Sequence, residues 1–176
     1  ASVPGSFAFT NPATVLNAGV HPSVGVVFTP TDTINYNTVA LTVSVTVNKA
    51  TPVIITWPTA ANITYGQTLA DATLTGGTAS VAGSFAFTSP ATVPEVGTAQ
   101  YEVTFTPTDT ANYNTTTGMV SVTVNKALPV LTAPTATAII LGQTLASSNL
   151  IGGSATANGL NVTGTFAFVD PAITPS

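Results

Sequence analysis

The sequence repeats itself, and this feature most constrains the fold that the chain can adopt. The stretch FTPTDTINYN at residues 28–37 returns as FTPTDTANYN at 105–114, with one residue changed, and VTVNKA at 45–50 returns at 122–127. The copies of both stretches share one spacing, and self-similarity at a fixed period is the signature of a tandem array. The sequence therefore predicts repeats of about 77 residues.

The positions of these copies predict the domain organisation. One complete repeat spans residues 51–127, residues 1–50 match the C-terminal part of a repeat, and residues 128–176 match the N-terminal part of a further one. The last match rests on ITYGQTLADATLTGG at 63–77 and IILGQTLASSNLIGG at 139–153. Because the chain starts and stops within a repeat, we expect it to be a stretch of a longer array.

Alternation of apolar and polar residues predicts the fold class. In AQYEVTFT at 99–106, Tyr101, Val103 and Phe105 alternate with polar residues, and MVSVTVNK at 119–126 follows the same pattern. A period of two is typical of strands with one face on a core and the other in water. The expected strands of the complete repeat are 52–57, 66–77, 83–88, 99–106 and 119–126. Short strands separated by Gly and Pro predict an all-β fold of two-sheet sandwiches without disulfides.

Composition excludes several function classes. The chain has two lysines, no arginine, six acidic residues and no cysteine. This balance leaves almost nothing to neutralise phosphates, so a nucleic-acid partner is not expected. Thiolate metal sites and disulfides are impossible. No apolar run is long enough to span a membrane, so no membrane insertion is expected in this segment.

The motifs YGQTL, GSFAFTSPATVP, FTPTDTANYN and VSVTVNKA resemble the bacterial immunoglobulin-like repeats of large cell-surface and adhesin-type proteins. The resemblance covers essentially the whole chain. It implies tandem immunoglobulin-like β-sandwich repeats that serve as stalks, spacers or fibre segments. It also implies an extracellular or cell-surface location.

The repeated polar motif also resembles the tyrosine corner of immunoglobulin domains. By that resemblance Tyr36 and Tyr113 anchor the corner through a hydroxyl bond to upstream backbone, while Asp32 and Asp109 cap the turn. The alternative is a calcium site, which needs several carboxylates. Each copy offers one carboxylate and no D-x-D spacing, so the sequence favours a structural corner and predicts no metal site.

Catalytic and cofactor sites are not expected. His21 is the only histidine, and the sequence favours a solvated loop residue over a member of a catalytic triad. The glycine-rich stretch at 76–83 does not lead into GK[ST], so no phosphate loop is predicted. Glycosylation is a separate hypothesis, because Asn62, Asn114 and Asn161 fit the N-x-[ST] acceptor pattern.

These observations predict a structural protein and not an enzyme. We expect an extracellular stalk or filament segment whose partners are neighbouring copies of the same repeat or chain. Head-to-tail self-assembly by strand complementation is a further expectation, because the partial repeats at the two ends are complementary. The alternative is an adhesin module that binds a host or environmental glycan or protein. The chain offers trypsin-like proteases only two sites, Lys49 and Lys126, both at junctions between repeats, so we expect resistance to such proteases.

Overall fold

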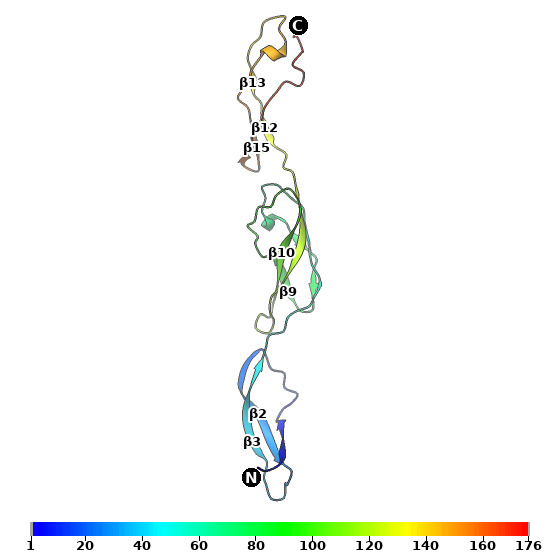
Figure 1. Ribbon diagram of the computed structural model, residues 1–176, viewed down its shortest axis with the longest axis vertical. Helices are drawn as coiled ribbons and strands as arrows, with labels where there is room; N and C mark the ends of the chain where they lie inside the picture. The colour runs from blue at the N-terminus through cyan, green and yellow to red at the C-terminus, as the bar shows by residue number, and fades with distance from the viewer. Residues whose placement is uncertain (1, 176) are drawn as a thin grey trace. The chain divides into compact units, whose positions relative to one another are not determined.

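The computed structural model describes residues 2–175 and confirms the all-β class (Figure 1). Its only helical pieces in that range are two three-residue 3₁₀ turns, and no helix there is long and apolar enough to cross a membrane. Backbone packing divides the chain into two compact units. The first takes in residues up to Pro58, Gly76–Ala86 and Val103–Gly118, and the second takes in Thr59–Thr75, Phe87–Glu102 and Met119 onward. The predicted repeat boundaries at 50/51 and 127/128 remain predictions.

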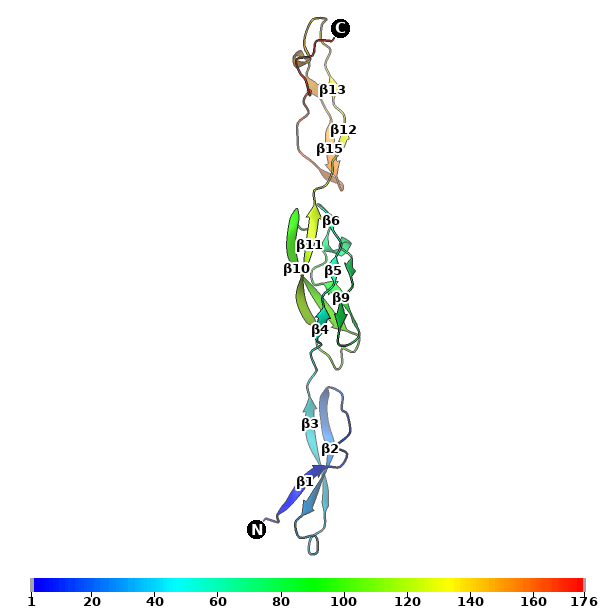
Figure 2. The same ribbon diagram turned by 90° about the vertical axis from the view of Figure 1, so that its right-hand side faces the viewer.

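Residues 2–50, here called the head segment, form one antiparallel sheet in the order β1-β2-β3 (Figures 1 and 2). Its strands are β1 (Gly5–Phe9), β2 (Gly19–Pro30) and β3 (Val39–Val47). The register places Phe7 opposite Phe28, and the two rings are 4.9 Å apart between centroids. Alternation in the sequence thus brings aromatic side chains from neighbouring strands together on one face.

His21 lies within β2 and not in a solvated loop, which corrects the sequence-based expectation. The pairing of β2 with β3 shifts register between His21 and Val24. The stretch GVHPSVGVVFTPTD at 19–32 is one residue longer than its copy GTAQYEVTFTPTD at 97–109, and the extra residue is accommodated inside the strand as a bulge. The half-buried His21 ring contacts the carbonyl oxygen of Asn17 through Nε2 at 2.8 Å.

Residues 51–127, the central segment, contain a four-stranded sheet in the order β6-β11-β10-β9 and two two-stranded pieces, β4-β8 and β5-β7 (Figure 2). In chain order the strands are β4 (Ile54–Thr56), β5 (Thr59–Ala60), β6 (Ile63–Thr64), β7 (Leu74–Thr75), β8 (Thr78–Ala79), β9 (Gly83–Phe87), β10 (Gly97–Pro107) and β11 (Thr116–Asn125). The predicted strands near the last three are confirmed, and both β10 and β11 begin slightly earlier in the chain than expected.

The predicted strand at 66–77 is wrong. Its first half forms the 3₁₀ turn η1 (Leu69–Asp71), and only Leu74–Thr75 is strand. The Asp71 carboxylate accepts hydrogen bonds from the Thr68 amide at 2.8 Å and from the Thr68 hydroxyl at 2.9 Å. A carboxylate that satisfies the amide before a helical turn favours the turn over an extended chain. Leu69, the first residue of this turn, is buried.

Residues 128–175, the tail segment, hold β12 (Val130–Thr132), β13 (Thr135–Ala136), η2 (Leu145–Ser147), β14 (Leu150–Ile151), β15 (Ser154–Ala157) and β16 (Leu160–Asn161). The first four of these elements follow β4, β5, η1 and β7 in the same order and at the repeat spacing. β15 begins at the place of β8 and pairs with β12 as β8 pairs with β4, whereas its hairpin partner β16 is additional. The hairpin turns at Asn158 and Gly159, whose positive φ angles of 49° and 78° suit a tight two-residue hairpin turn.

Burial differs between two stretches of identical sequence, VSVTV at 43–47 in β3 and at 120–124 in β11. In β11, Val120, Val122 and Val124 are 6%, 0% and 3% exposed. At the matching positions of β3, one repeat earlier, Val43 is 36% exposed and Val45 and Val47 are half-buried. Nine of the ten buried hydrophobic residues in the described chain lie in the central segment, and the tenth is Val26 in β2. The central segment alone therefore has a developed core.

Candidate interaction site at the repeated corner

The two copies of the polar motif form the same turn. In the corner at 109–113, the Asp109 carboxylate accepts hydrogen bonds from the Asn112 amide nitrogen at 3.1 Å and from the Asn112 side-chain amide at 2.7 Å. The Tyr113 amide donates to the Asp109 carbonyl at 3.1 Å. The corner at 32–36 repeats this set with Asp32, Asn35 and Tyr36, at 3.1, 2.8 and 3.2 Å. Asp32 and Asp109 therefore occupy capping positions.

The two tyrosines act in a way that the sequence did not predict. Within residues 2–175 neither the Tyr36 hydroxyl nor the Tyr113 hydroxyl has a hydrogen-bond partner, and Tyr36 is half exposed. The turn is closed instead by the tyrosine backbone amide and by the aspartate–asparagine pair. Because these bonds already satisfy the turn, it closes without the hydroxyl latch that the resemblance implied.

Hydrogen bonding lowers the pKa of both aspartates. For Asp109 the main cause is the side-chain amide of Asn112, followed by the Asn112 backbone amide, with a small contribution from the charge of Lys49. For Asp32 the side-chain and backbone amides of Asn35 have the same effect on the pKa. Donors that favour the carboxylate over the neutral acid shift the pKa in this direction. Both carboxylates are fully exposed to solvent.

The corner at 109–114 is bound by the end of the head segment. Ala50 pairs with Tyr113 as a parallel bridge, in which the Ala50 amide donates to the Asn112 carbonyl and the Asn114 amide donates to the Ala50 carbonyl, both at 2.9 Å. All these residues belong to the first compact unit. The corner thus serves as a short edge that accepts a passing strand.

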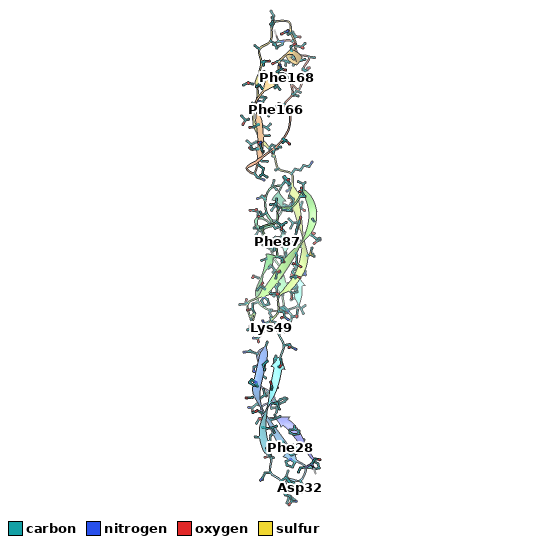
Figure 3. The ribbon with its side chains drawn as sticks, turned by 60° about the vertical axis from the view of Figure 1, so that its left-hand side comes forward. Phe28, Asp32, Lys49, Phe87, Phe166 and Phe168 are labelled. Carbon is teal, nitrogen blue, oxygen red and sulfur yellow. The ribbon has the colours of Figure 1, made fainter. Side chains whose placement is uncertain are left out.

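Side chains add to this bridge. The Lys49 ammonium donates to the Thr110 carbonyl at 2.7 Å, and Lys49 is labelled in Figure 3. The Ala18 amide donates to the Asn112 side-chain carbonyl at 2.7 Å, and the Asn114 side chain donates to the Thr51 hydroxyl at 3.3 Å. We call this set of contacts the corner clamp. It consists of the corner Asp109–Asn114 and its bound residues Ala18 and Lys49–Thr51.

Asn112 is the central residue of the corner clamp, although the sequence alone did not single it out. Its side-chain nitrogen binds Asp109 while its side-chain oxygen binds Ala18, so one amide caps the turn and holds the neighbouring loop. The signal was present, because the asparagine before the tyrosine is unchanged in both motif copies. The sequence alone does not say whether the side-chain nitrogen or the side-chain oxygen of Asn112 binds a residue outside the turn.

The other copy of the corner has no such partner. Among residues 2–175, Asp32 is the only residue that bonds the Asn35 side chain, and Ile34 and Tyr36 are 93% and 50% exposed. Asp32 is labelled in Figure 3. Lys126 and Ala127, which match Lys49 and Ala50, likewise form no hydrogen bond to a corner within the described residues. The described chain therefore carries one complete corner clamp and the two separate halves of another.

The remaining candidate residues are dispersed. Asn62 and Asn161 are exposed, whereas Asn114 is held in the corner clamp by its bond to Thr51. No group of three or more His, Asp or Glu side chains among residues 2–175 is placed to hold a metal ion. A hollow on the head segment is lined by residues that include Phe9, Leu16, His21 and Val45. The chain matches none of the family models, curated proteins or solved structures with which it was compared.

Proposed function

We propose that this protein is a segment of an extracellular stalk or filament built from tandem immunoglobulin-like β-sandwich repeats. Two observations support the repeat, whose period is about 77 residues. The sequence recurs at this period, and segments with matching sequence form matching local structure, as β4, β5, η1 and β7 do with β12, β13, η2 and β14. In this proposal each repeat buries its own core, and the chain gains length by adding repeats.

The corner clamp is the observation that carries the mechanical role. It joins the last residues of one proposed repeat and the first of the next, Lys49–Thr51, to the corner Asp109–Asn114 through backbone and side-chain hydrogen bonds. Both halves of the clamp recur at the repeat period. An array under tension needs a joint whose two halves are present in every repeat, because each added repeat then brings its own connection.

The chemistry of the chain supports an exterior location. Cysteine is absent, charge is low, and the only two lysines lie at the proposed junctions. Pro52 and Pro129 follow these lysines and restrict the backbone there. Such a chain offers trypsin-like proteases few sites and has no thiol to be oxidised.

Two experiments test the proposal. Antibodies raised against residues 51–127 should label intact producing cells, and labelling that appears only after permeabilisation would contradict the location. Pulling the chain by its ends should unfold the central segment in one step, with a length gain of about 250 Å from the extended length of about 77 residues. Gradual extension without a force peak would contradict the mechanical role.

A further inference from the structure

We propose that Asn158 is a site of spontaneous deamidation, and that its conversion to aspartate or isoaspartate releases the β15–β16 hairpin from Tyr65. The reaction is hydrolysis of the side-chain amide, started by the Gly159 backbone nitrogen and completed by water. The modification itself follows from the local sequence and structure. Its consequence for a junction between repeats rests on the proposed function.

Asn158 has the neighbour that this reaction favours. It is the only asparagine in the chain that a glycine follows. The Gly159 nitrogen has to reach the side-chain carbon Cγ of Asn158, and a side chain on the following residue hinders this approach. Glycine has no side chain and adopts many backbone conformations. Every other asparagine precedes a residue with a Cβ atom, so the reaction is expected first at Asn158.

The structure leaves both reacting groups accessible. Asn158 and Gly159 form the exposed turn between β15 and β16, and the space beside Gly159 is open. Within residues 2–175 the Gly159 amide donates no hydrogen bond. The attacking nitrogen is therefore held by no bond that has to break first, and water reaches the turn freely.

The loop at the same place in the central segment is exposed as well. There Ser80 and Ala82 are exposed, although the central segment has a developed core. The tail segment has GGSATANGLNVTG at 152–164 where the central segment has the shorter GGTASVAG at 76–83. The extra length provides the hairpin that presents Asn158 to solvent.

The reaction converts the amide to an acid in two steps. The Gly159 nitrogen loses its proton and bonds to Cγ of Asn158, the Cγ–Nδ2 bond breaks, and Nδ2 leaves as ammonia. The product is a cyclic imide, in which the Gly159 nitrogen is bonded to both carbonyl carbons of residue 158. Water then breaks either bond: loss of the bond to Cγ gives aspartate, and loss of the original peptide bond gives isoaspartate. Nothing is oxidised or reduced.

The amide that is lost holds the hairpin at Tyr65. Nδ2 of Asn158 donates to the Tyr65 carbonyl oxygen at 2.6 Å, and the same atom lies 3.3 Å from where a Cβ on Gly66 would be. All three residues belong to the second compact unit. Deamidation replaces the donor by a carboxylate oxygen, which only accepts hydrogen bonds. Two acceptors then face each other, so the contact with Tyr65 opens.

This contact lies beside the junction at Lys126. Tyr65, Lys126 and Ala127 line one hollow together with Leu160 of the hairpin. The hairpin and the peptide bond after Lys126 therefore border the same space. Release of the hairpin makes that bond more accessible to a protease, because cleavage requires a locally opened chain. In the proposed stalk, deamidation thus makes an older chain easier to cut at this junction.

The test is incubation of the full 176-residue chain at neutral and at mildly alkaline pH, followed by trypsin digestion and mass spectrometry. Fragment 127–176 should gain about 1 Da with time, as the amide becomes an acid. The gain should be faster at alkaline pH, because the attacking nitrogen has to lose its proton. Labelling by an isoaspartyl methyltransferase should detect isoaspartate in the same fragment.

Two variants locate the reaction. Asn158→Gly removes the amide and keeps a residue that suits the hairpin turn, so fragment 127–176 should then keep its mass. Asn161→Ser is the matched control, because Asn161 is an exposed asparagine of the same hairpin that a valine follows, and the gain should persist. Circular dichroism checks that both variants fold. A wild-type fragment of constant mass overturns the inference, and so does a gain that Asn158→Gly leaves unchanged.

The release of the hairpin has its own measurement. Cleavage after Lys126 should become several-fold faster as the wild-type chain deamidates, while cleavage after Lys49 keeps its rate. Asn158→Asp should be cut after Lys126 at the faster rate from the start. Equal cleavage rates in fresh and deamidated chains overturn the release. Neither result touches the proposed stalk, which the cell-labelling and pulling experiments test.

Discussion

The side-chain ammonium of Lys49 donates a hydrogen bond of 2.7 Å to the carbonyl oxygen of Thr110, across 61 residues of sequence. Thr110 lies in the turn that Asp109 caps, and Ala50, the next residue after Lys49, is bridged to the same turn. A motif that resembled a local corner thus also binds a segment remote in sequence. Substitution, proteolysis and acid each test this double role.

Asn112→Ala should lower the free energy of unfolding by about 1–3 kcal/mol, because it removes bonds to both Asp109 and Ala18 at about 1 kcal/mol each. The matched control is Asn35→Ala, which removes only the bond to Asp32 and should cost about half as much. Urea denaturation of both variants measures the difference. Equal losses would show that the contact with Ala18 contributes nothing.

Trypsin should cut first after Lys126 and only later after Lys49. Lys49 is bonded to Thr110, and both backbone polar groups of Ala50 are engaged in the bridge to the corner. Lys126 has no hydrogen bond within residues 2–175 and lies outside the strands. Intact-mass measurement over a digestion time course should show fragments 1–126 and 127–176 early. Asn112→Ala should accelerate cleavage after Lys49, and early cleavage there in the wild-type chain would contradict the clamp.

Stability should fall in acid as the corner carboxylates of Asp32 and Asp109 are protonated. The folded pKa of Asp109 is lowered by Asn112 from its ordinary value of 3.8. A lowered folded pKa means that the stabilisation is fully present above the ordinary value and is lost as the pH falls from about 3.8 through the folded pKa. Melting temperature measured from pH 6 to pH 2 should therefore drop below about pH 4. The melting temperature of Asp109→Asn should fall less steeply with pH. An unchanged slope would exclude the Asp109 carboxylate as a source of the acid sensitivity.

Gly118→Leu should destabilise the chain by about 1–3 kcal/mol or more, because the new side chain overlaps the Trp57 ring. Adding Trp57→Ala should recover most of the loss, since it removes the ring that the leucine would overlap. Thermal denaturation of the single and double variants measures the coupling. Additive losses would show that positions 57 and 118 do not adapt to each other.

Tyr113→Phe should change the free energy of unfolding by less than about 0.5 kcal/mol, as expected for a surface change that breaks no bond. The Tyr113 hydroxyl has no hydrogen-bond partner within the described residues, and the turn is held by its backbone amide. Urea denaturation beside the wild-type chain checks this. A loss of about 1 kcal/mol or more, the usual contribution of one hydrogen bond, would restore the hydroxyl latch that the resemblance to immunoglobulin corners implied.

The sequence by itself determined the all-β class and the positions of the long strands. Apolar and polar residues alternate strictly in 99–106 and 119–126, and such alternation favours strands whatever the rest of the chain does. The repeat period is likewise a property of the sequence alone. The prediction of a strand at 66–77 is wrong because the Asp71 carboxylate accepts a hydrogen bond from the Thr68 amide, which favours a turn. Hydrophobic periodicity contains no information about such a bond.

Only the tertiary structure decided what each pattern packs against. Val43 in β3 and Val120 in β11 have nearly identical neighbours in sequence, yet one is exposed and the other buried. Burial depends on residues far away in the chain, and among residues 2–175 these cover Val120 more completely than Val43. The corner motif behaves in the same way. Its turn is fixed locally by aspartate and asparagine, but its role as a clamp depends on Ala18 and Lys49–Thr51, which only folding brings to it.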